Sequence, residues 1–152
     1  MVLTNMLNYN DADAEVVFEY TGEGCVVPKG VTSVRFHPSV IDVRYGAFMN
    51  CNNLSEVDLN EGLQRIGWRA FYDCKVLSSI KLPSTVTEIS SFAFQDCHNL
   101  REVILHGIPR EIGKFAFYNC TSLERFTFPT ISSRLDNLIQ TGHWEEVNNR
   151  VD

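Results

Sequence analysis

Four cysteines recur at a fixed interval, and they are the residues of this sequence that could most readily carry chemistry. Cys51, Cys74, Cys97 and Cys120 follow one another at 23-residue steps. Thiolates bind zinc and also form disulfides, so such a row raises both possibilities. A tetrahedral zinc site needs ligands that converge on one point, whereas consecutive turns of a repeat lie about 5 Å apart along a line. The spacing therefore argues against a metal site.

Disulfides between neighbouring turns are not excluded by the Cα separation alone. The chain has five cysteines, an odd number, and its 152 residues are enough to bury a core without cross-links. We therefore expect the four periodic cysteines to be reduced and buried, as small apolar side chains. Cys25 stands where later units carry a phenylalanine, and we expect it to be more accessible.

The histidines and the known catalytic motifs give no further site. His37 and His106 share a repeat position three turns apart, about 14 Å at the usual strand spacing, so they cannot share an ion. His98 and His143 are expected to face solvent. The sequence contains no Walker, Gly-x-Ser-x-Gly or His-Glu-x-x-His pattern. We predict no catalytic residue, no cofactor and no metal, and an enzyme is the lowest-ranked class.

The overall composition excludes other classes. The formal charge is −6 with 13 scattered basic residues, which argues against nucleic acid as a partner. No apolar stretch is long enough to span a bilayer. The first eight residues lack the basic start and apolar run of a secretory signal, so we prefer the cytoplasm to the cell surface. A monomer is expected.

The elements that would position these residues repeat with the same period as the cysteines. Each unit begins with a strand in which apolar residues alternate, such as Ile80 and Leu82, and a Pro- or Gly-containing turn ends it. A second short extended segment follows, with two apolar positions such as Val86 and Ile89. Because Pro109 replaces one of these positions in the next unit, we expect the register to be disturbed there.

Each unit ends in an Ala-Phe-x-Asx-Cys turn, for which we predict one turn of α- or 3₁₀-helix. The phenylalanine is large enough to fill the interior of a coil, and the alanine is small enough to allow close approach of the next turn. The aspartate or asparagine can bond nearby amides where the turn closes. The phenylalanines are Phe48, Phe71, Phe94 and Phe117.

The repeat pattern also predicts the limits of the structure. Residues 1–30 form a leader and a capping strand with a partial repeat, in which Val17 and Tyr20 precede Val40 and Val43 by one period. Residues 31–131 form a solenoid of about 23-residue units.

Residues 132–152 are predicted to form a helical cap over the end of the coil. Leu135, Leu138 and Ile139 have helical spacing, and Gly142 is a plausible stop. The whole chain is expected to be one structural domain.

The block of residues 82–103 resembles the BspA-like branch of the leucine-rich repeat superfamily. That family repeats Leu-Pro-x-x-Val-x-x-Ile-x-x-x-Ala-Phe-x-x-Cys-x-x-Leu-x-x-Ile, and this block matches it almost position by position. The likeness implies an α/β fold, a right-handed leucine-rich-repeat solenoid with a parallel β-sheet on one face. It also implies protein binding or surface adhesion, without shared catalytic residues.

The outward side of the repeated strand is the predicted partner-binding surface. One outward column contains Arg35, Asp58, Lys81, Ile104 and Thr127, and the column before it contains Ser33, Glu56, Ser79, Glu102 and Arg125. Ile104 is expected as an exposed apolar residue among polar ones. The candidate binding residues are Arg35, Glu56, Asp58, Lys81, Glu102, Ile104, Arg125 and Thr127.

Three interpretations of this surface remain open. The first is a non-enzymatic scaffold that binds a protein partner through the strand face. The second is a structural or adhesive segment that self-associates or forms part of a surface array. The third is a solvated sheet face, because alternating charges on neighbouring strands stabilise a sheet without any partner.

Overall fold

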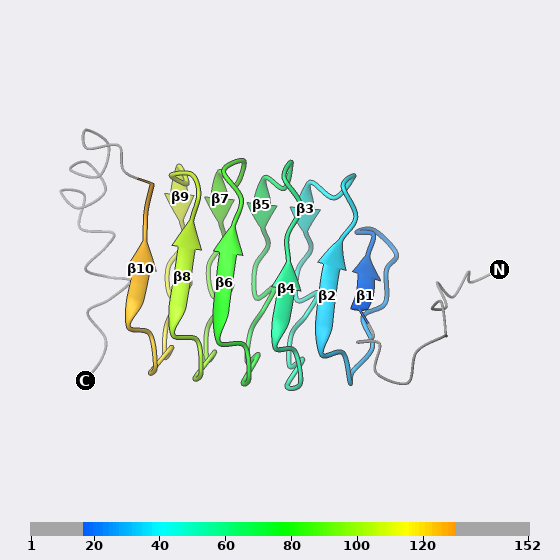
Figure 1. The fold of residues 1–152 in the computed structure, drawn as a ribbon, viewed down its shortest axis with the longest axis horizontal. Helices are drawn as coiled ribbons and strands as arrows, with labels where there is room; N and C mark the ends of the chain where they lie inside the picture. Colours follow the sequence, from blue (N-terminus) through cyan, green and yellow to red (C-terminus); the bar gives the residue numbers. More distant parts are fainter. Residues whose placement is uncertain (1–16, 130–152) are drawn as a thin grey trace.

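The chain folds into a parallel-strand β-solenoid of about four turns (Figure 1). The computed structural model describes residues 17–129. Each of the four complete turns contributes a longer strand and a two-residue strand, one further longer strand lies at each end, and the strands of successive turns stack side by side. Two ladders of parallel strands therefore run along the length of the coil.

The first ladder holds the longer strands. It comprises β1 (Val17–Tyr20), β2 (Ser33–Phe36), β4 (Glu56–Asp58), β6 (Ser79–Leu82), β8 (Glu102–Leu105) and β10 (Arg125–Thr127). Hydrogen bonds join β1, β2 and β4 into one three-stranded sheet and β6, β8 and β10 into another. β4 and β6 lie next to each other in Figure 1 without ladder pairing, so the first ladder is interrupted at its centre.

The second ladder is continuous and lies behind the first in Figure 1. It comprises β3 (Asp42–Val43), β5 (Arg65–Ile66), β7 (Glu88–Ile89) and β9 (Glu111–Ile112). The sequence predicted these segments as short extended pieces. A parallel sheet was predicted on only one face, whereas the structure has a second parallel ladder.

Pro109 does not disturb the register. Glu88 pairs with Glu111 and Ile89 with Ile112, as the 23-residue spacing requires, and Pro109 is buried in the apolar position. The equivalent amide of Val86 donates to a turn carbonyl and not to the ladder. A proline at this position therefore removes only a turn hydrogen bond.

The N-terminal strand β1 lies in a different position from the one expected. Val17 pairs with Ser33 and Tyr20 with Phe36, so β1 precedes β2 in the first ladder. The 23-residue extrapolation had placed Val17 and Tyr20 beside the segment that contains β3, and this was wrong because the first turn of the coil is shorter. Tyr20 is buried instead among aromatic rings, with its ring centroid 4.8 Å from that of Phe36 and 5.0 Å from that of Phe48.

The Ala-Phe-x-Asx-Cys segments are hydrogen-bonded turns, and residues 17–129 contain no helix. Phe48 N–H donates to the carbonyl of Ala70 in the next turn, whereas Met49 N–H donates three residues back to Gly46. Successive amides of the segment thus donate alternately to a carbonyl of the next turn of the coil and to a carbonyl of their own turn. The prediction of one helical turn here was wrong because of the backbone angles of these segments.

Two positions in every such turn adopt left-handed backbone angles, which a right-handed helix does not allow. The aspartate or asparagine is one of them, with φ of 62° at Asn50, 57° at Asp73, 62° at Asp96 and 59° at Asn119. These residue types tolerate this region better than most. The other position is Gly46 in the first turn but Arg69, Phe92 and Phe115 in the later ones.

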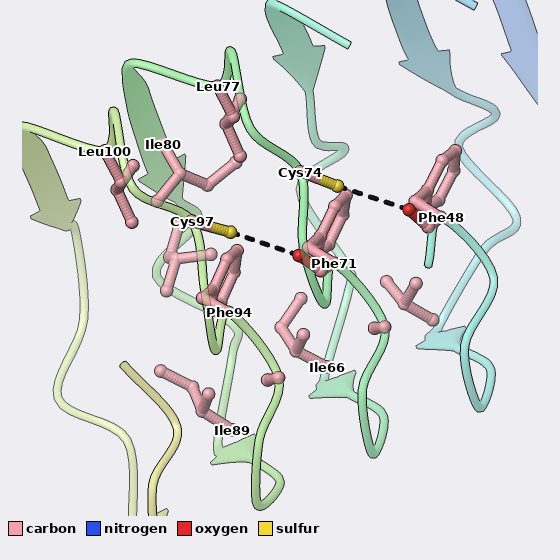
Figure 2. Packing of buried hydrophobic residues seen from close by; sticks show 14 of the residues in the cluster. Phe48, Ile66, Phe71, Cys74, Leu77, Ile80, Ile89, Phe94, Cys97 and Leu100 are labelled. Carbon is pink, nitrogen blue, oxygen red and sulfur yellow. Dashed lines mark hydrogen bonds between the residues drawn. The ribbon is translucent and has the colours of Figure 1, made fainter. Parts of the chain in front are cut away.

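The core is a set of columns that run along the coil axis (Figure 2). The rings of Phe48, Phe71, Phe94 and Phe117 stack almost in parallel, with centroids 5.0, 5.2 and 5.1 Å apart. All four are buried. The prediction that these phenylalanines fill the coil is confirmed.

The predicted helical cap at 132–152 and the leader before Val17 lie outside the described residues. Within the described part, Phe126 and Phe128 pack against the last turn, with ring centroids 5.0 Å apart, and Phe126 meets Phe117 edge-on. No helix of the part described by the structure is long and apolar enough to cross a membrane.

Candidate protein-binding surface

The first ladder holds the two predicted outward columns in register within each of its halves. Arg35 lies beside Asp58, and Lys81, Ile104 and Thr127 follow one another across β6, β8 and β10. The same pairing aligns the preceding column, in which Ser79, Glu102 and Arg125 are neighbours. The buried residues that alternate with the two columns, such as Val103 and Leu105, hold each strand against the core.

Two ion pairs occur in these columns among residues 17–129. Arg35 Nε lies 3.2 Å from Asp58 Oδ2, with side chains 65% and 71% exposed. Arg125 Nε lies 3.0 Å from Glu102 Oε1. Exposed pairs of this kind contribute about 0–1 kcal/mol to stability. The expected alternation of Arg35, Asp58 and Lys81 thus occurs only in part, because Asp58 and Lys81 lie on β4 and β6, which are not paired.

Two residues of the columns differ from expectation. Ser33, the first residue of β2, is only 5% exposed, so it is buried and does not belong to the outward face. Ile104 is half-buried, because it lies between the neighbouring strands β6 and β10. Its side chain therefore offers less surface to a partner than a fully exposed isoleucine would.

The cysteine column is part of the core, as predicted. Cys74, Cys97 and Cys120 donate from Sγ to the carbonyls of Phe48, Phe71 and Phe94 in the preceding turns, at 3.2, 3.1 and 3.1 Å. Figure 2 shows the first two of these bonds. Burial raises the pKa of the Cys51 and Cys120 thiols, so both are poor nucleophiles at neutral pH.

Cys25 is half-buried and therefore more accessible than the four buried thiols. His37 Nδ1 lies 2.7 Å from Ser39 Oγ. His98 was expected to face solvent but is half-buried, and its Nδ1 lies 3.1 Å from the carbonyl oxygen of Asn119. His143 lies outside the described residues. Residues 17–129 contain no cluster of metal-ligating side chains.

A groove on the second ladder was not found by the sequence reasoning. It is an open depression of about 360 Å³. Its lining comprises Asp42, Val43, Arg44, Tyr45, Arg65, Gly67, Trp68, Glu88 and Ser90. The signal was present in the sequence, since Asp42, Arg65 and Glu88 share one repeat position and Tyr45 and Trp68 share another.

An aromatic row borders this groove. Tyr45 and Trp68 stack with centroids 5.0 Å apart, and Trp68 meets Phe92 edge-on at 5.8 Å. The guanidinium of Arg69 lies 4.2 Å from the Trp68 ring centre, a cation–π geometry. Phe115 continues the row, with its ring centroid 5.5 Å from that of Phe92.

Comparison with known proteins agrees with the repeat geometry. A family model of the BspA-type leucine-rich repeat region matches residues 22–140 with six copies. The chain belongs to the BspA-type leucine-rich repeat family. The match begins before residue 31 and ends after residue 131, so it is wider than the solenoid limits predicted from the repeat pattern. No curated protein matches the chain.

Two solved structures resemble this member of the BspA-type family. One is a leucine-rich cell surface protein from Faecalibacterium prausnitzii A2-165, with a TM-score of 0.67 and 26% identity over 79% of this chain. The other is a leucine-rich repeat protein from Bacteroides ovatus ATCC 8483, with a TM-score of 0.61 and 32% identity over 72% of this chain. The matches cover 34% and 27% of those two chains.

Proposed function

We propose that this chain is a non-catalytic scaffold that binds a protein partner through the outward face of the first ladder. The observation that carries the proposal is the pair of outward columns, whose residues are fixed at strand spacing by a fully buried core. A rigid display of this kind lowers the entropy lost on binding. Family membership supports an interaction or surface-scaffold role in general terms.

The size of the columns limits the kind of interface. Strands of about four residues, stacked six deep, cover roughly 24 by 13 Å, or on the order of 300 Å². A standard interface buries about 800 Å² on each partner. A partner of the first ladder must therefore also contact the bordering turns, or bind weakly.

The test is an affinity capture from the source cell with matched variants. The first variant combines Arg35→Ala, Asp58→Ala, Lys81→Ala and Ile104→Ala on the first ladder. The control combines Arg110→Ala, Glu111→Ala and Lys114→Ala, which are exposed charges on and beside β9 of the second ladder. The proposal expects that partners are lost with the first variant and kept with the control.

The result that contradicts this proposal is a partner set that survives the first variant unchanged. Circular dichroism and urea denaturation of both variants show that the coil is intact. Because all the substituted residues apart from Ile104 are exposed, folding should be little affected.

A second candidate is a structural segment of a longer array. It is favoured by the observation that the chain matches only 34% and 27% of the two similar solved structures. Solenoid turns stack on one another, so the ends of a coil can extend by addition of further turns. Light scattering over a range of concentrations distinguishes the candidates: an array segment associates as concentration rises, whereas a self-contained scaffold stays monomeric.

A further inference from the structure

The groove on the second ladder has a balanced set of charges. Its lining contains two carboxylates, Asp42 and Glu88, and two guanidinium groups, Arg44 and Arg65, so the formal charge of the lining is zero. Arg65 forms an ion pair with Asp42, and this contact raises the pKa of Arg65. Arg44 Nη1 lies 3.8 Å from Oε1 of Glu23, which is outside the groove lining. A groove of paired charges has little net field with which to attract an ion.

The same groove offers hydrogen-bond donors and acceptors in fixed positions. The Arg65 guanidinium donates, and the carboxylates of Asp42 and Glu88 accept. Ser90 donates to Glu88 over 2.9 Å, which orients that carboxylate. Strand residues supply all of these groups except Ser90, which directly follows β7.

One wall of the groove is aromatic and partly open to solvent. Tyr45 is 65% exposed although one of its faces stacks on Trp68. The planes of the two rings are nearly parallel, with an angle of 8° between them. Aromatic side chains next to polar groups suit a ligand that has both C–H surfaces and hydroxyl groups.

A glycine in the groove lining lets two neighbouring turns of the coil pack closely. A Cβ atom at Gly67 would lie 2.2 Å from the carbonyl oxygen of Val43, so the backbones of these turns approach too closely for a side chain. The volume of the groove, about 360 Å³, is at the low end of the range of about 300–1,000 Å³ for ligand pockets.

We propose that this groove binds a neutral oligosaccharide. Sugar hydroxyls both donate and accept, so they can bond to the guanidinium and to the carboxylates without carrying a charge. The aromatic wall provides contact for the C–H face of a sugar ring. The groove is open and not enclosed, so a ligand can extend beyond it, which suits an internal segment of a glycan chain.

This site is separate from the first ladder, and the two proposals can fail independently. The groove is lined by residues of β3, β5 and β7 and of the turns that follow them. An open site of this size gives modest affinity, with a dissociation constant on the order of 1 mM. Nuclear magnetic resonance detects binding of that strength.

The experiment follows the indole N–H signal of Trp68 during titration of the full chain. A Trp144→Phe variant assigns the signal, because the chain has only two tryptophans. The probes are maltohexaose, cellohexaose, xylohexaose and N-acetylchitohexaose, which are all neutral. We expect saturable shifts of the Trp68 signal with at least one of these probes.

Matched variants connect the shift to the groove. Tyr45→Ala and Glu88→Gln should each weaken binding about tenfold, as expected when a ring contact or a charged acceptor is lost. Tyr118→Ala removes another exposed aromatic residue, and Glu111→Gln changes the next carboxylate of the same ladder column. Both controls lie outside the groove lining and should leave the affinity unchanged.

Two results would overturn the proposal. The first is the absence of any saturable Trp68 shift with all four probes at millimolar concentration. The second is an affinity that Tyr45→Ala and Glu88→Gln leave unchanged, or that the controls Tyr118→Ala and Glu111→Gln reduce equally. Wild-type-like amide spectra of the variants exclude unfolding as the cause of a loss.

Discussion

The stacked phenylalanine column makes a quantitative prediction about neighbouring turns. Phe71 and Phe94 are fully buried, with centroids 5.2 Å apart and planes within 3°. Substitution of either by leucine keeps most of the apolar burial but removes the ring contact. Aromatic pairs contribute about 0.5–1.5 kcal/mol beyond burial, so a double-mutant cycle between these two residues should give a coupling energy in that range.

The control is a cycle between Phe71 and Phe117, which are separated by Phe94 and do not stack on each other. Their coupling should be close to zero, since effects at separated sites add. Urea denaturation followed by circular dichroism and by fluorescence measures both cycles, and coincident curves establish cooperative unfolding. Equal coupling in the two cycles, or none between Phe71 and Phe94, would refute the stacking argument.

Three further predictions follow from the turns, the thiols and the outward face. Asp96 has a left-handed φ of 62°, so Asp96→Ala should lower the free energy of unfolding by about 1–2 kcal/mol and Asp96→Asn by less, as measured by urea denaturation. Burial raises the pKa of Cys120 above its ordinary value of 9.0, so the folded state retains a proton that the unfolded state loses. The stability that the Cys120 thiol contributes is therefore full below about pH 9. It falls as pH rises beyond that value, by up to about 1.4 kcal/mol per pH unit. Cys120→Ala should make this slope shallower in alkaline denaturation, and an unchanged slope would count against the thiol. Arg35→Ala should change stability by less than about 1 kcal/mol, and added salt should reduce the difference between it and the wild type; a larger loss would show that the Arg35–Asp58 pair does more than a surface contact.

The repeat was readable from the sequence because every turn buries the same side chains. The phenylalanines, the cysteines and the leucines each recur at a fixed spacing, and each set forms one column of the core. A single unit cannot bury its apolar face alone, so the units must stack. The pairing of Lys81 with Ile104 in the outward column followed from the same spacing. Identical burial in each unit leaves a strong periodic signal.

The parts that were missed depend on backbone angles or on how neighbouring turns combine, and neither can be seen in the residues of one unit. Left-handed φ at Arg69 and Phe92 has no residue signature, so the turn was mistaken for a helix. The shorter first turn moved β1 into the first ladder, because extrapolation by one period assumes a complete unit. The groove combines side chains from three turns, so the repeat positions of its charged and aromatic residues were visible in the sequence but no single unit contains the groove.

A footprint of side-chain reactivity tests the central claim most directly. Carbodiimide labelling of carboxylates is compared in the free chain and in its captured complex, with Asp58 on the first ladder and Glu111 on the second, both exposed in the free chain. Our account predicts that the partner protects Asp58 and leaves Glu111 unchanged. Protection of Glu111 with Asp58 unaffected would contradict binding through the first ladder.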